Sequence, residues 1–424
     1  MNHKALAKSI FMDALEGSLP KNFMHKNCFL DGDILHLAQN NYALREHKNL
    51  YVFGSGKAAY SMAKEIESIL GERIYKGLVI TPYDEGELQT IEVHLGSHPV
   101  PTQKSLDAAK ALVSMMQECD EDDLYIFLLS GGSSALMELP IEPITLEDLQ
   151  ATTKLMLSNN LDIHEINTIR KHLSNIKGGR LANLCKATGA VLLISDIIDN
   201  DLESIASGSL YADKTTFLGA KSILDKKGLF DKLPLNVQSV LERGIVGTLE
   251  ESPFVPLQRV KHQILASNAE ALYIAQESAK AKSLRVKKVN EPMDGEVSVM
   301  IKKMLTIIEN SEENCILFGG ECTVTLNGDG KGGRNQHAAL LMLKEIHDKK
   351  LNITFLSAGT DGVDGNSDAT GAVVDIDSYL KELDIDEYIN NFDSNSYFNK
   401  SHSTIVTGPS GTNVIDIAII IKGE

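Results

Sequence analysis

The 424-residue sequence lacks any apolar run long enough to cross a membrane, which takes about 18 consecutive apolar residues. Its longest apolar runs, such as residues 417–421, have the length of buried strands. The first residues lack a secretory pattern, because Asp13 and Glu16 interrupt any apolar stretch. We therefore predict a cytoplasmic protein without a membrane partner.

Cysteine is scarce and follows no binding pattern. The five cysteines are scattered, odd in number, and form no CxxC or Cys/His cluster. This pattern argues against both a disulfide framework and a structural zinc site. We interpret Cys322, which lies beside a glycine-rich segment, as a small buried residue.

The chain also lacks an excess of basic residues, since its formal net charge is −17. Binding to nucleic-acid phosphates needs clustered Lys and Arg, so we predict no nucleic-acid partner. A locally basic site for a small anionic substrate is compatible with this charge. The oligomeric state stays open, with a homodimer as one option.

What the sequence does contain is a recurring unit of apolar strand, glycine-rich turn and helix. Such alternation predicts an α/β fold with a mainly parallel sheet, whose ligands bind at the carboxyl ends of the strands. A polar, proline-containing stretch, 231–256, suggests a boundary, and the pattern then restarts. We therefore expect two α/β domains, 1–245 and 257–424, the first a Rossmann-like three-layer α/β/α domain. The expected strands are 49–53, 76–81, 123–129, 190–194, 263–266, 315–318, 323–326, 353–357, 403–407 and 414–421, and the expected helices 57–70, 268–282 and 332–346.

The first glycine-rich loop is Gly54-Ser55-Gly56-Lys57-Ala58-Ala59. Glycines let the backbone approach a ligand, and the start of the following helix suits an anion. The loop is not a Walker A motif, because the flanking positions hold Tyr51 and Ala58. It fits the looser dinucleotide form G-x-G-x-x-A, with Asp84 as a ribose ligand, and Lys57 adds a positive charge.

Two further segments suit anions. The loop Ser130-Gly131-Gly132-Ser133-Ser134 combines glycines and hydroxyls after a predicted strand, as a phosphate or carboxylate nest does. Residues 167–180 hold Arg170, Lys171, Lys177 and Arg180 in an otherwise acidic protein. This cluster is either a solvated helix face or an anion clamp, and the charge pattern favours neither.

Acidic loops follow other predicted strands. They contain Asp196, Glu321, and the pair Asp361 and Asp364, and such oxygen-rich loops suit Mg²⁺. A third glycine-rich loop, 328–336, carries Arg334, whose side chain can bind phosphate oxygens in bidentate fashion. Anion loops, a Lys, an Arg and a metal site are the parts that phosphoryl transfer needs.

With these motifs in order, the sequence resembles the type-2 glycerate kinases (glycerate 2-kinases), whose C-terminal part is the MOFRL domain. The resemblance implies two α/β domains, the second of the MOFRL type, with the active site in the interdomain cleft. It also implies ATP-dependent phosphorylation of D-glycerate to 2-phosphoglycerate, with ATP and Mg²⁺ as cofactors. The motifs that carry it are residues 54–59, 97–101, 130–136, 169–182, 195–208, 319–336, 358–375 and 407–416.

The resemblance further implies roles for individual residues. Lys57 and Arg334 bind phosphate or the transferring group, and Asp196 is the candidate base. Asp361 and Asp364 are candidate metal ligands. The candidates for binding substrate or nucleotide are Gly54, Ser55, Gly56, Ser130, Gly131, Gly132, Ser133, Ser134, Lys177, Arg180, Glu321, Gly408 and Ser410.

The sequence departs from the family at several loop positions, among them Ser133, where a third glycine is usual. Three alternatives therefore stay open beside the glycerate kinase. One is a kinase for a related small hydroxy acid, and another an NAD(P)H-dependent hydroxypyruvate reductase. The third is a non-catalytic protein that binds a nucleotide or a sugar acid.

Overall fold

The computed structural model describes residues 2–326 and 328–423, so that Asn327, within the 319–336 motif, lies outside the described residues. The chain divides into two compact units. The N-terminal unit comprises residues 24–194 and 200–265, and the C-terminal unit comprises residues 2–23, 195–199 and the remainder from 266 onward. The domain limits 1–245 and 257–424 stay predictions, and each unit is described by itself.

The N-terminal unit contains a six-stranded sheet in the order β6-β5-β4-β7-β8-β9. The pairings of β6 with β5, β5 with β4, β4 with β7 and β7 with β8 are parallel. The Gly189 amide donates to Arg259 O, and the Ser195 amide donates to Ala266 O. Residue numbers thus increase together along β8 and β9, so this pairing is parallel as well. The strands are β4 (Leu50–Ser55), β5 (Lys76–Thr81), β6 (Ile91–Leu95), β7 (Leu124–Leu129), β8 (Thr188–Ile194) and β9 (Val260–Ala266).

This strand order has a switch point between β4 and β7. From β4 the chain moves outward to β5 and β6, then returns to the other side of β4 to form β7. Because crossovers are right-handed, α3 (Ala59–Leu70) and α4 (Gln103–Gln117) cover opposite faces. Every residue of β4 and β7 is buried, as expected of strands covered on both faces. The loops after β4 and β7 thus meet where such folds bind ligands.

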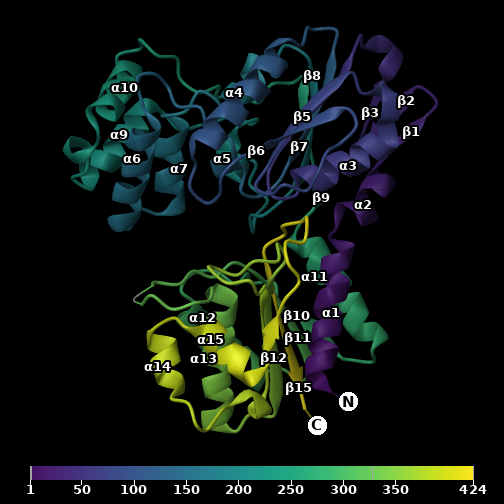
Figure 1. Ribbon diagram of the computed structural model, residues 1–424, viewed down its shortest axis with the longest axis vertical. Helices are drawn as coiled ribbons and strands as arrows, with labels where there is room; N and C mark the ends of the chain where they lie inside the picture. The colour runs from purple at the N-terminus through teal and green to yellow at the C-terminus, as the bar shows by residue number, and fades with distance from the viewer. Residues whose placement is uncertain (1, 327, 424) are drawn as a thin grey trace. The chain divides into compact units, whose positions relative to one another are not determined.

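A group of helices forms a second core in the N-terminal unit (Figure 1). It includes Leu233, Val237, Val240 and Leu241, so part of the predicted boundary stretch 231–256 is folded into this core, while the domain limits themselves stay predictions. Apolar residues at helical spacing, Val237, Val240 and Leu241, bury one face of α10 in this core. The helices are α6 (Leu146–Ser158), α7 (Ile163–Lys171), α9 (Phe217–Lys226) and α10 (Leu235–Ile245), and two short helices, α5 (Ser133–Leu136) and α8 (Arg180–Leu184), lie near the main sheet.

A small antiparallel sheet, not predicted from the sequence, also belongs to this unit. Its strands are β1 (Cys28–Asp31), β2 (Ile34–Leu37) and β3 (Asn40–Ala43), and they follow α2 (Pro20–Asn27). Strand β1 packs on α3. The strands are only four residues each, too short for a clear alternating pattern.

The C-terminal unit is built on a mixed six-stranded sheet in the order β10-β11-β15-β12-β13-β14. The last strand, β15, lies at the centre and runs antiparallel to both neighbours, β11 and β12. The predicted strand at 323–326 is wrong, because only Thr323 makes an isolated bridge there, to Glu296. The strands are β10 (Val286–Lys288), β11 (Cys315–Gly320), β12 (Ile353–Gly359), β13 (Gly371–Val374), β14 (Thr404–Ile405) and β15 (Asp416–Lys422).

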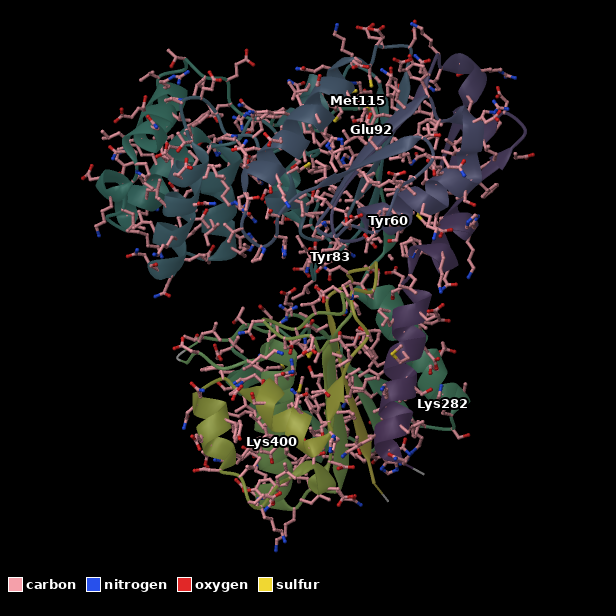
Figure 2. All side chains as sticks on the ribbon, viewed as in Figure 1. Tyr60, Tyr83, Glu92, Met115, Lys282 and Lys400 are labelled. Atoms are coloured by element: carbon pink, nitrogen blue, oxygen red, sulfur yellow. The ribbon has the colours of Figure 1, made fainter. Side chains whose placement is uncertain are left out.

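Helices cover both faces of this sheet, with α1 and α11 on one side and α12, α13 and α15 on the other (Figure 1). The first helix, α1, comes from the opposite end of the chain and packs on β12, β15 and α11. Lys282, which caps α11 and is labelled in Figure 2, bonds Asp13 of α1 at 2.7 Å. The helices are α1 (His3–Gly17), α11 (Asn268–Ala281), α12 (Val297–Glu309), α13 (Arg334–Lys349), α14 (Ile385–Asn390) and α15 (Ser394–Ser401).

Over the described part of the chain, no helix combines the length and the apolar character that a membrane span requires. The five cysteines are buried and unbridged, and Cys322 belongs to the core of the C-terminal unit, as interpreted from the sequence.

Candidate active site

The loops after β4 and β7 are bonded to each other. Lys57 N donates to Gly131 O at 2.9 Å, and Ala58 N donates to the Ser130 hydroxyl at 3.0 Å. Gly56 has a φ of +134°, and a Cβ there would lie 2.1 Å from Ser130 Oγ, so only glycine fits this approach. Two loops predicted as separate anion sites therefore form one structure.

The two loops differ in which backbone amides remain for a ligand. The amides of residues 56–59 donate to oxygens of the protein. By contrast, the amides of residues 131–134 have no acceptor within the described residues. Successive unengaged amides next to left-handed Gly132 form the kind of nest that binds an oxyanion. The loop after β7 supplies this nest, and the loop after β4 supplies Lys57.

Lys57 and His98 both approach Gly132. A Cβ on Gly132 would lie 3.4 Å from Lys57 Cγ and 3.0 Å from His98 Cδ2. His98 was not among the predicted site residues, although its motif, 97–101, was noted. Its position just after the carboxyl end of β6 was the available signal.

Two hydroxyls in these loops lack partners. Ser55 and Ser133 are buried, and neither Oγ makes a hydrogen bond to a described residue. A buried unsatisfied polar group costs about 1–3 kcal/mol, so each such group calls for an explanation. Ser133 is therefore notable, since it stands where the family usually has glycine.

Most cations of the basic cluster 170–180 are bonded to other groups of the protein. Lys171 bonds the buried Asp213 at 3.2 Å, and Lys177 bonds the buried Glu138 at 2.5 Å. Arg180 donates to three backbone carbonyl oxygens. Burial lowers the pKa of Lys177 to about 8, although Glu138 acts in the opposite direction. These contacts favour a positioning role for Lys177 and Arg180 over direct binding of substrate.

The glycines of this cluster are engaged as well. Gly178 N donates to Ser207 O at 3.1 Å, and Gly179 N donates to Gly208 O at 2.7 Å. Ala206, Ser207 and Gly208 are successive left-handed residues, and such strained turns occur where the surroundings fix them. The hydroxyl of Ser207 meets the Ser134 hydroxyl at 2.7 Å, so this turn reaches the loop after β7.

In the C-terminal unit, Arg334 begins α13 and is held by two carboxylates. Its Nε and Nη2 bond Asp416 at 2.6 and 3.0 Å, and its Nη1 lies 2.8 Å from Glu321 Oε1. Burial acts to lower the pKa of Arg334, but Asp416 and Glu321 prevail and raise it above its usual value. Asp416 reaches this position because β15 runs antiparallel, so its first residue pairs with Gly320 and Gly359 at the ends of β11 and β12.

Asp361 lies close to this pair. A Cβ on Gly359 would lie 3.2 Å from Asp416 Oδ1 and 3.3 Å from Asp361 Oδ1. Ser410 N donates to Asp361 O at 3.2 Å, and a Cβ on Gly362 would meet Gly408 O at 1.9 Å. The predicted residues Glu321, Arg334, Asp361, Gly408 and Ser410 therefore gather at one edge of this sheet.

The carboxylate of Asp364, a predicted metal ligand, is engaged by the start of α13. It is buried, and its carboxylate accepts from the backbone amides of Asn335 and Gln336 and from the Gln336 side chain. Burial raises the pKa of Asp364 to about 6. The carboxylate thus caps α13, whose start is electropositive.

Asp196 follows β8, and its segment, 195–199, belongs to the C-terminal unit. Ser195 N donates to Ala266 O at 2.9 Å, which sets this segment beside the start of α11. Asp196 itself is half-buried. Its place relative to Lys57, in the other unit, and the predicted interdomain site both stay predictions.

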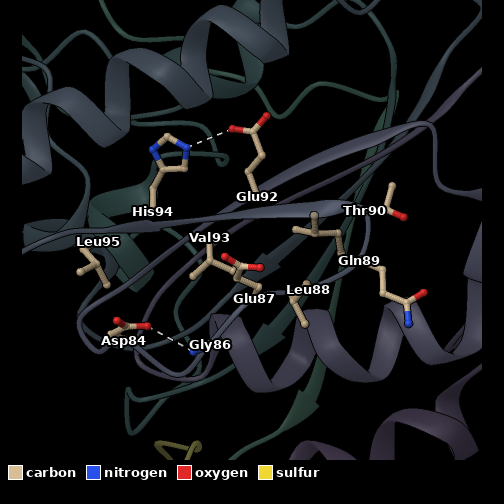
Figure 3. Close-up of a pocket in the computed structure, with 11 residues that line it drawn as sticks. Asp84, Gly86, Glu87, Leu88, Gln89, Thr90, Glu92, Val93, His94 and Leu95 are labelled. Atoms are coloured by element: carbon tan, nitrogen blue, oxygen red, sulfur yellow. Dashed lines mark hydrogen bonds and ion pairs between the residues drawn. The ribbon is translucent and has the colours of Figure 1, made fainter.

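The predicted ribose ligand Asp84 lines a pocket of about 530 Å³ (Figure 3). The pocket is lined by one stretch, 84–95, and by no residue of the loops after β4 and β7. Asp84 Oδ1 accepts from the backbone amide of Gly86 at 3.3 Å, and Glu92 pairs with His94 at 3.1 Å. The carboxylate thus bonds to its own loop, which weakens the dinucleotide interpretation.

A nest of unengaged amides with an adjacent Lys at the switch point of one unit, and a carboxylate-held Arg in the other, are features typical of α/β proteins that bind phosphorylated ligands. Family models agree: residues 6–242 match the domain of unknown function DUF4147, and residues 314–416 match the MOFRL family. The chain belongs to the glycerate kinase family, as predicted.

Among curated proteins, the glycerate 2-kinase of Pyrococcus horikoshii is 39% identical over 88% of this chain and 87% of its own. The D-glycerate 2-kinase of Thermotoga maritima is 34% identical over 86% and 88%. A putative hydroxypyruvate reductase of Agrobacterium vitis is also 34% identical, over 91% and 90%. The crystal structure of the Thermotoga maritima glycerate kinase matches with a TM-score of 0.83 at 31% identity, covering 99% of both chains.

Proposed function

We propose that this chain is an ATP-dependent kinase that phosphorylates the 2-hydroxyl of D-glycerate to give 2-phosphoglycerate. One observation carries the proposal: the amides of residues 131–134 form an oxyanion nest beside Lys57, at the switch point of the sheet. Relatives named glycerate 2-kinase match this chain over most of both lengths.

The proposed chemistry is one displacement at phosphorus. The substrate hydroxyl oxygen bonds to the γ-phosphorus of ATP, the bond to the bridging oxygen breaks, and ADP leaves. Asp196 is proposed to accept the hydroxyl proton. Lys57 and Arg334 would neutralise charge on the phosphoryl oxygens, which is most of what catalysis of this reaction requires.

The residues present fit Mg²⁺ only in part. No group of three or more His, Cys, Asp or Glu arranged for a metal occurs among the described residues. Mg²⁺ needs one or two carboxylates beside phosphate and water, so Asp361 alone suffices as a protein ligand. We retain Asp361 as the candidate and not Asp364, whose oxygens bond to α13. When bound, Mg²⁺ would supply charge neutralisation of the phosphates.

Phosphorus NMR of the purified protein with Mg-ATP and D-glycerate tests the proposal. We expect a new monoester signal that matches 2-phosphoglycerate. A signal of 3-phosphoglycerate would keep the kinase but correct the position. Failure to consume ATP, with a folded protein, would reject the proposal.

Replacing Lys57 with Ala should lower kcat by about 100-fold or more, because an ammonium that acts on the transition state is lost. Lys64 is exposed on the following helix, α3, and Lys64→Ala is the matched control that should retain full activity. Equal rates for the two variants would remove Lys57 from the site.

The reductase is the second candidate, favoured by the G-x-G-x-x-A pattern and by the Agrobacterium vitis relative. It predicts loss of nicotinamide absorbance when NADH or NADPH is mixed with hydroxypyruvate and the protein. The bond of Asp84 to Gly86 disfavours it, because the ribose ligand is then already engaged.

A further inference from the structure

Among the described residues, Arg170 is the one cation of the basic cluster 170–180 that forms no ion pair and makes a single hydrogen bond. Lys171 and Lys177 are in buried ion pairs, and Arg180 is bonded to three carbonyl oxygens. Arg170 makes one hydrogen bond, from Nη2 to Ser134 O at 3.1 Å. No carboxylate among the described residues lies within ion-pair distance of Arg170.

Neutral hydrogen-bonding groups lie near Arg170, and the buried ion pair of Lys177 with Glu138 is close enough for Arg170 to help lower the pKa of Lys177. Asn167 lies one helical turn earlier on the same face of α7. Its Oδ1 accepts from the Ser207 hydroxyl at 3.2 Å, and that hydroxyl meets the hydroxyl of Ser134 at 2.7 Å. Three segments, α7, the loop after β7 and the left-handed turn at 206–208, therefore converge on one polar group.

A half-buried guanidinium without a counter-ion is unusual in a chain of net charge −17. Its planar fork matches a carboxylate in bidentate geometry. Because the other three cations of the cluster are satisfied, the group offers one positive charge, which balances one carboxylate. A triphosphate, with several negative charges, would need more.

We propose that Arg170, with Asn167, Ser134 and Ser207, binds the carboxylate of the acceptor acid, which makes it the residue group that selects acids over polyols. This inference rests on the proposed kinase function and deepens it. Arg170 bonds Ser134, which lies two residues beyond Gly132, and Lys57 approaches Gly132. The loop after β7 would therefore bind the substrate carboxylate near Ser134 and the hydroxyl that reacts near Gly132.

Steady-state kinetics of the full chain test this assignment. For Arg170→Gln we expect the KM for D-glycerate to rise roughly 10- to 100-fold, the loss typical of a charged hydrogen bond. The KM for ATP should stay within about twofold of the wild type, since no nucleotide contact is removed. Any slow phosphorylation of glycerol, which has no carboxylate, should be equal in the two proteins.

The matched control is Arg243→Gln. Arg243 is also half-buried in the same unit and donates one bond to a backbone carbonyl, of Glu142 at 2.9 Å. This control should leave both KM values unchanged. Arg170→Lys should fall between the wild type and Arg170→Gln, because charge returns without the bidentate fork.

Asn167→Asp is a second variant in case Arg170→Gln does not fold. It keeps the shape of the side chain but adds a negative charge beside Arg170, so it should also raise the KM for D-glycerate selectively. An unchanged KM in both variants, or a rise confined to ATP, would overturn the carboxylate assignment while the kinase stands. Absence of glycerate-dependent turnover in the wild type would instead reject the proposed function itself.

Discussion

At the scale of single residues, Arg334 is defined by its two unequal partners. The Asp416 side chain is 3% exposed and bonds the guanidinium through both oxygens, whereas the Glu321 side chain is 42% exposed and meets the guanidinium through Oε1. Exposed ion pairs contribute little, while the removal of one partner from a buried pair is costly. Asp416 therefore orients the guanidinium, and Glu321 adds charge.

We predict that Asp416→Asn lowers kcat by roughly 10- to 100-fold with a smaller effect on the KM for D-glycerate, because a misplaced guanidinium stabilises the transition state poorly. Glu321→Gln should change kcat by less than about threefold, as expected for an exposed contact. Initial-rate kinetics on both variants check this. Similar losses in the two would show that charge, rather than orientation, matters at Arg334.

His337 gives a prediction on pH. It is 6% exposed, its ring stacks on Phe392 at 4.5 Å, and burial lowers its pKa to about 4. Because the pKa of His337 is lower in the folded state, its contribution to the free energy of unfolding is fully present above the pKa of the unfolded state, near 6.5. That contribution is lost as the pH falls from there through about 4. Asp364, whose pKa is raised to about 6, acts in the opposite sense and contacts the same helix.

The urea midpoint should therefore fall less steeply between pH 6.5 and 4 in His337→Phe than in the wild type, since Phe cannot be protonated and can still stack. His347, also on α13 but 38% exposed, provides the control variant His347→Gln, which should keep the wild-type slope. Parallel curves for His337→Phe and the wild type would contradict the prediction.

At the scale of elements, α1 belongs to the unit that is mostly encoded at the other end of the chain. Phe11 is fully buried in α1, which packs on β12, β15 and α11. We predict that Phe11→Ala destabilises the C-terminal unit by about 3–5 kcal/mol. Met12→Ala, at an exposed neighbour, should have a small effect.

Hydrogen exchange resolved by segment checks this prediction. Amides of β12 and β15 should exchange faster in Phe11→Ala, while those of β4 and β7 should keep their protection. Faster exchange confined to β4 and β7 would show that α1 stabilises the other unit instead.

The same elements show what local sequence patterns can predict. Strand β5 has the predicted bounds, 76–81, and the bounds of β4, β7, β8, β11 and β12 lie within two residues of the predictions, because a short apolar run that ends at turn-forming residues is a local signal. The central, antiparallel position of β15 and the packing of α1 depend on partners far away in the chain. A local stretch of sequence therefore cannot predict where β15 lies in the sheet or on which strands α1 packs.

In the candidate site, too, features that depend on local sequence could be predicted and features that depend on distant partners could not. The loops of Lys57 and Ser130 could be predicted because glycine and hydroxyl residues follow strands, and they do meet. That Lys177 is buried against Glu138 depends on a residue 39 positions away, so the charge pattern could not distinguish a ligand-binding lysine from one paired within the protein. Arg170 can be recognised as a candidate ligand-binding residue only when the partners of the other three cations of the cluster 170–180 are known.

At the scale of the whole molecule, family and fold class are confirmed, and the family-model matches do not coincide with the compact units. The MOFRL match covers residues 314–416, yet the C-terminal unit also contains 2–23, 195–199 and the segment from 266. The chain passes between the units after residues 23, 194, 199 and 265.

The central place of β15 has a consequence for biosynthesis. A ribosome releases α1 first and β15 last among the described elements of the C-terminal unit, so α1 waits through nearly the whole of translation for the strands it covers. At about 5–20 residues per second, that delay is roughly tens of seconds. Meanwhile the N-terminal unit can complete its sheet, while the apolar side of α1 stays without the strands that bury it in the folded unit.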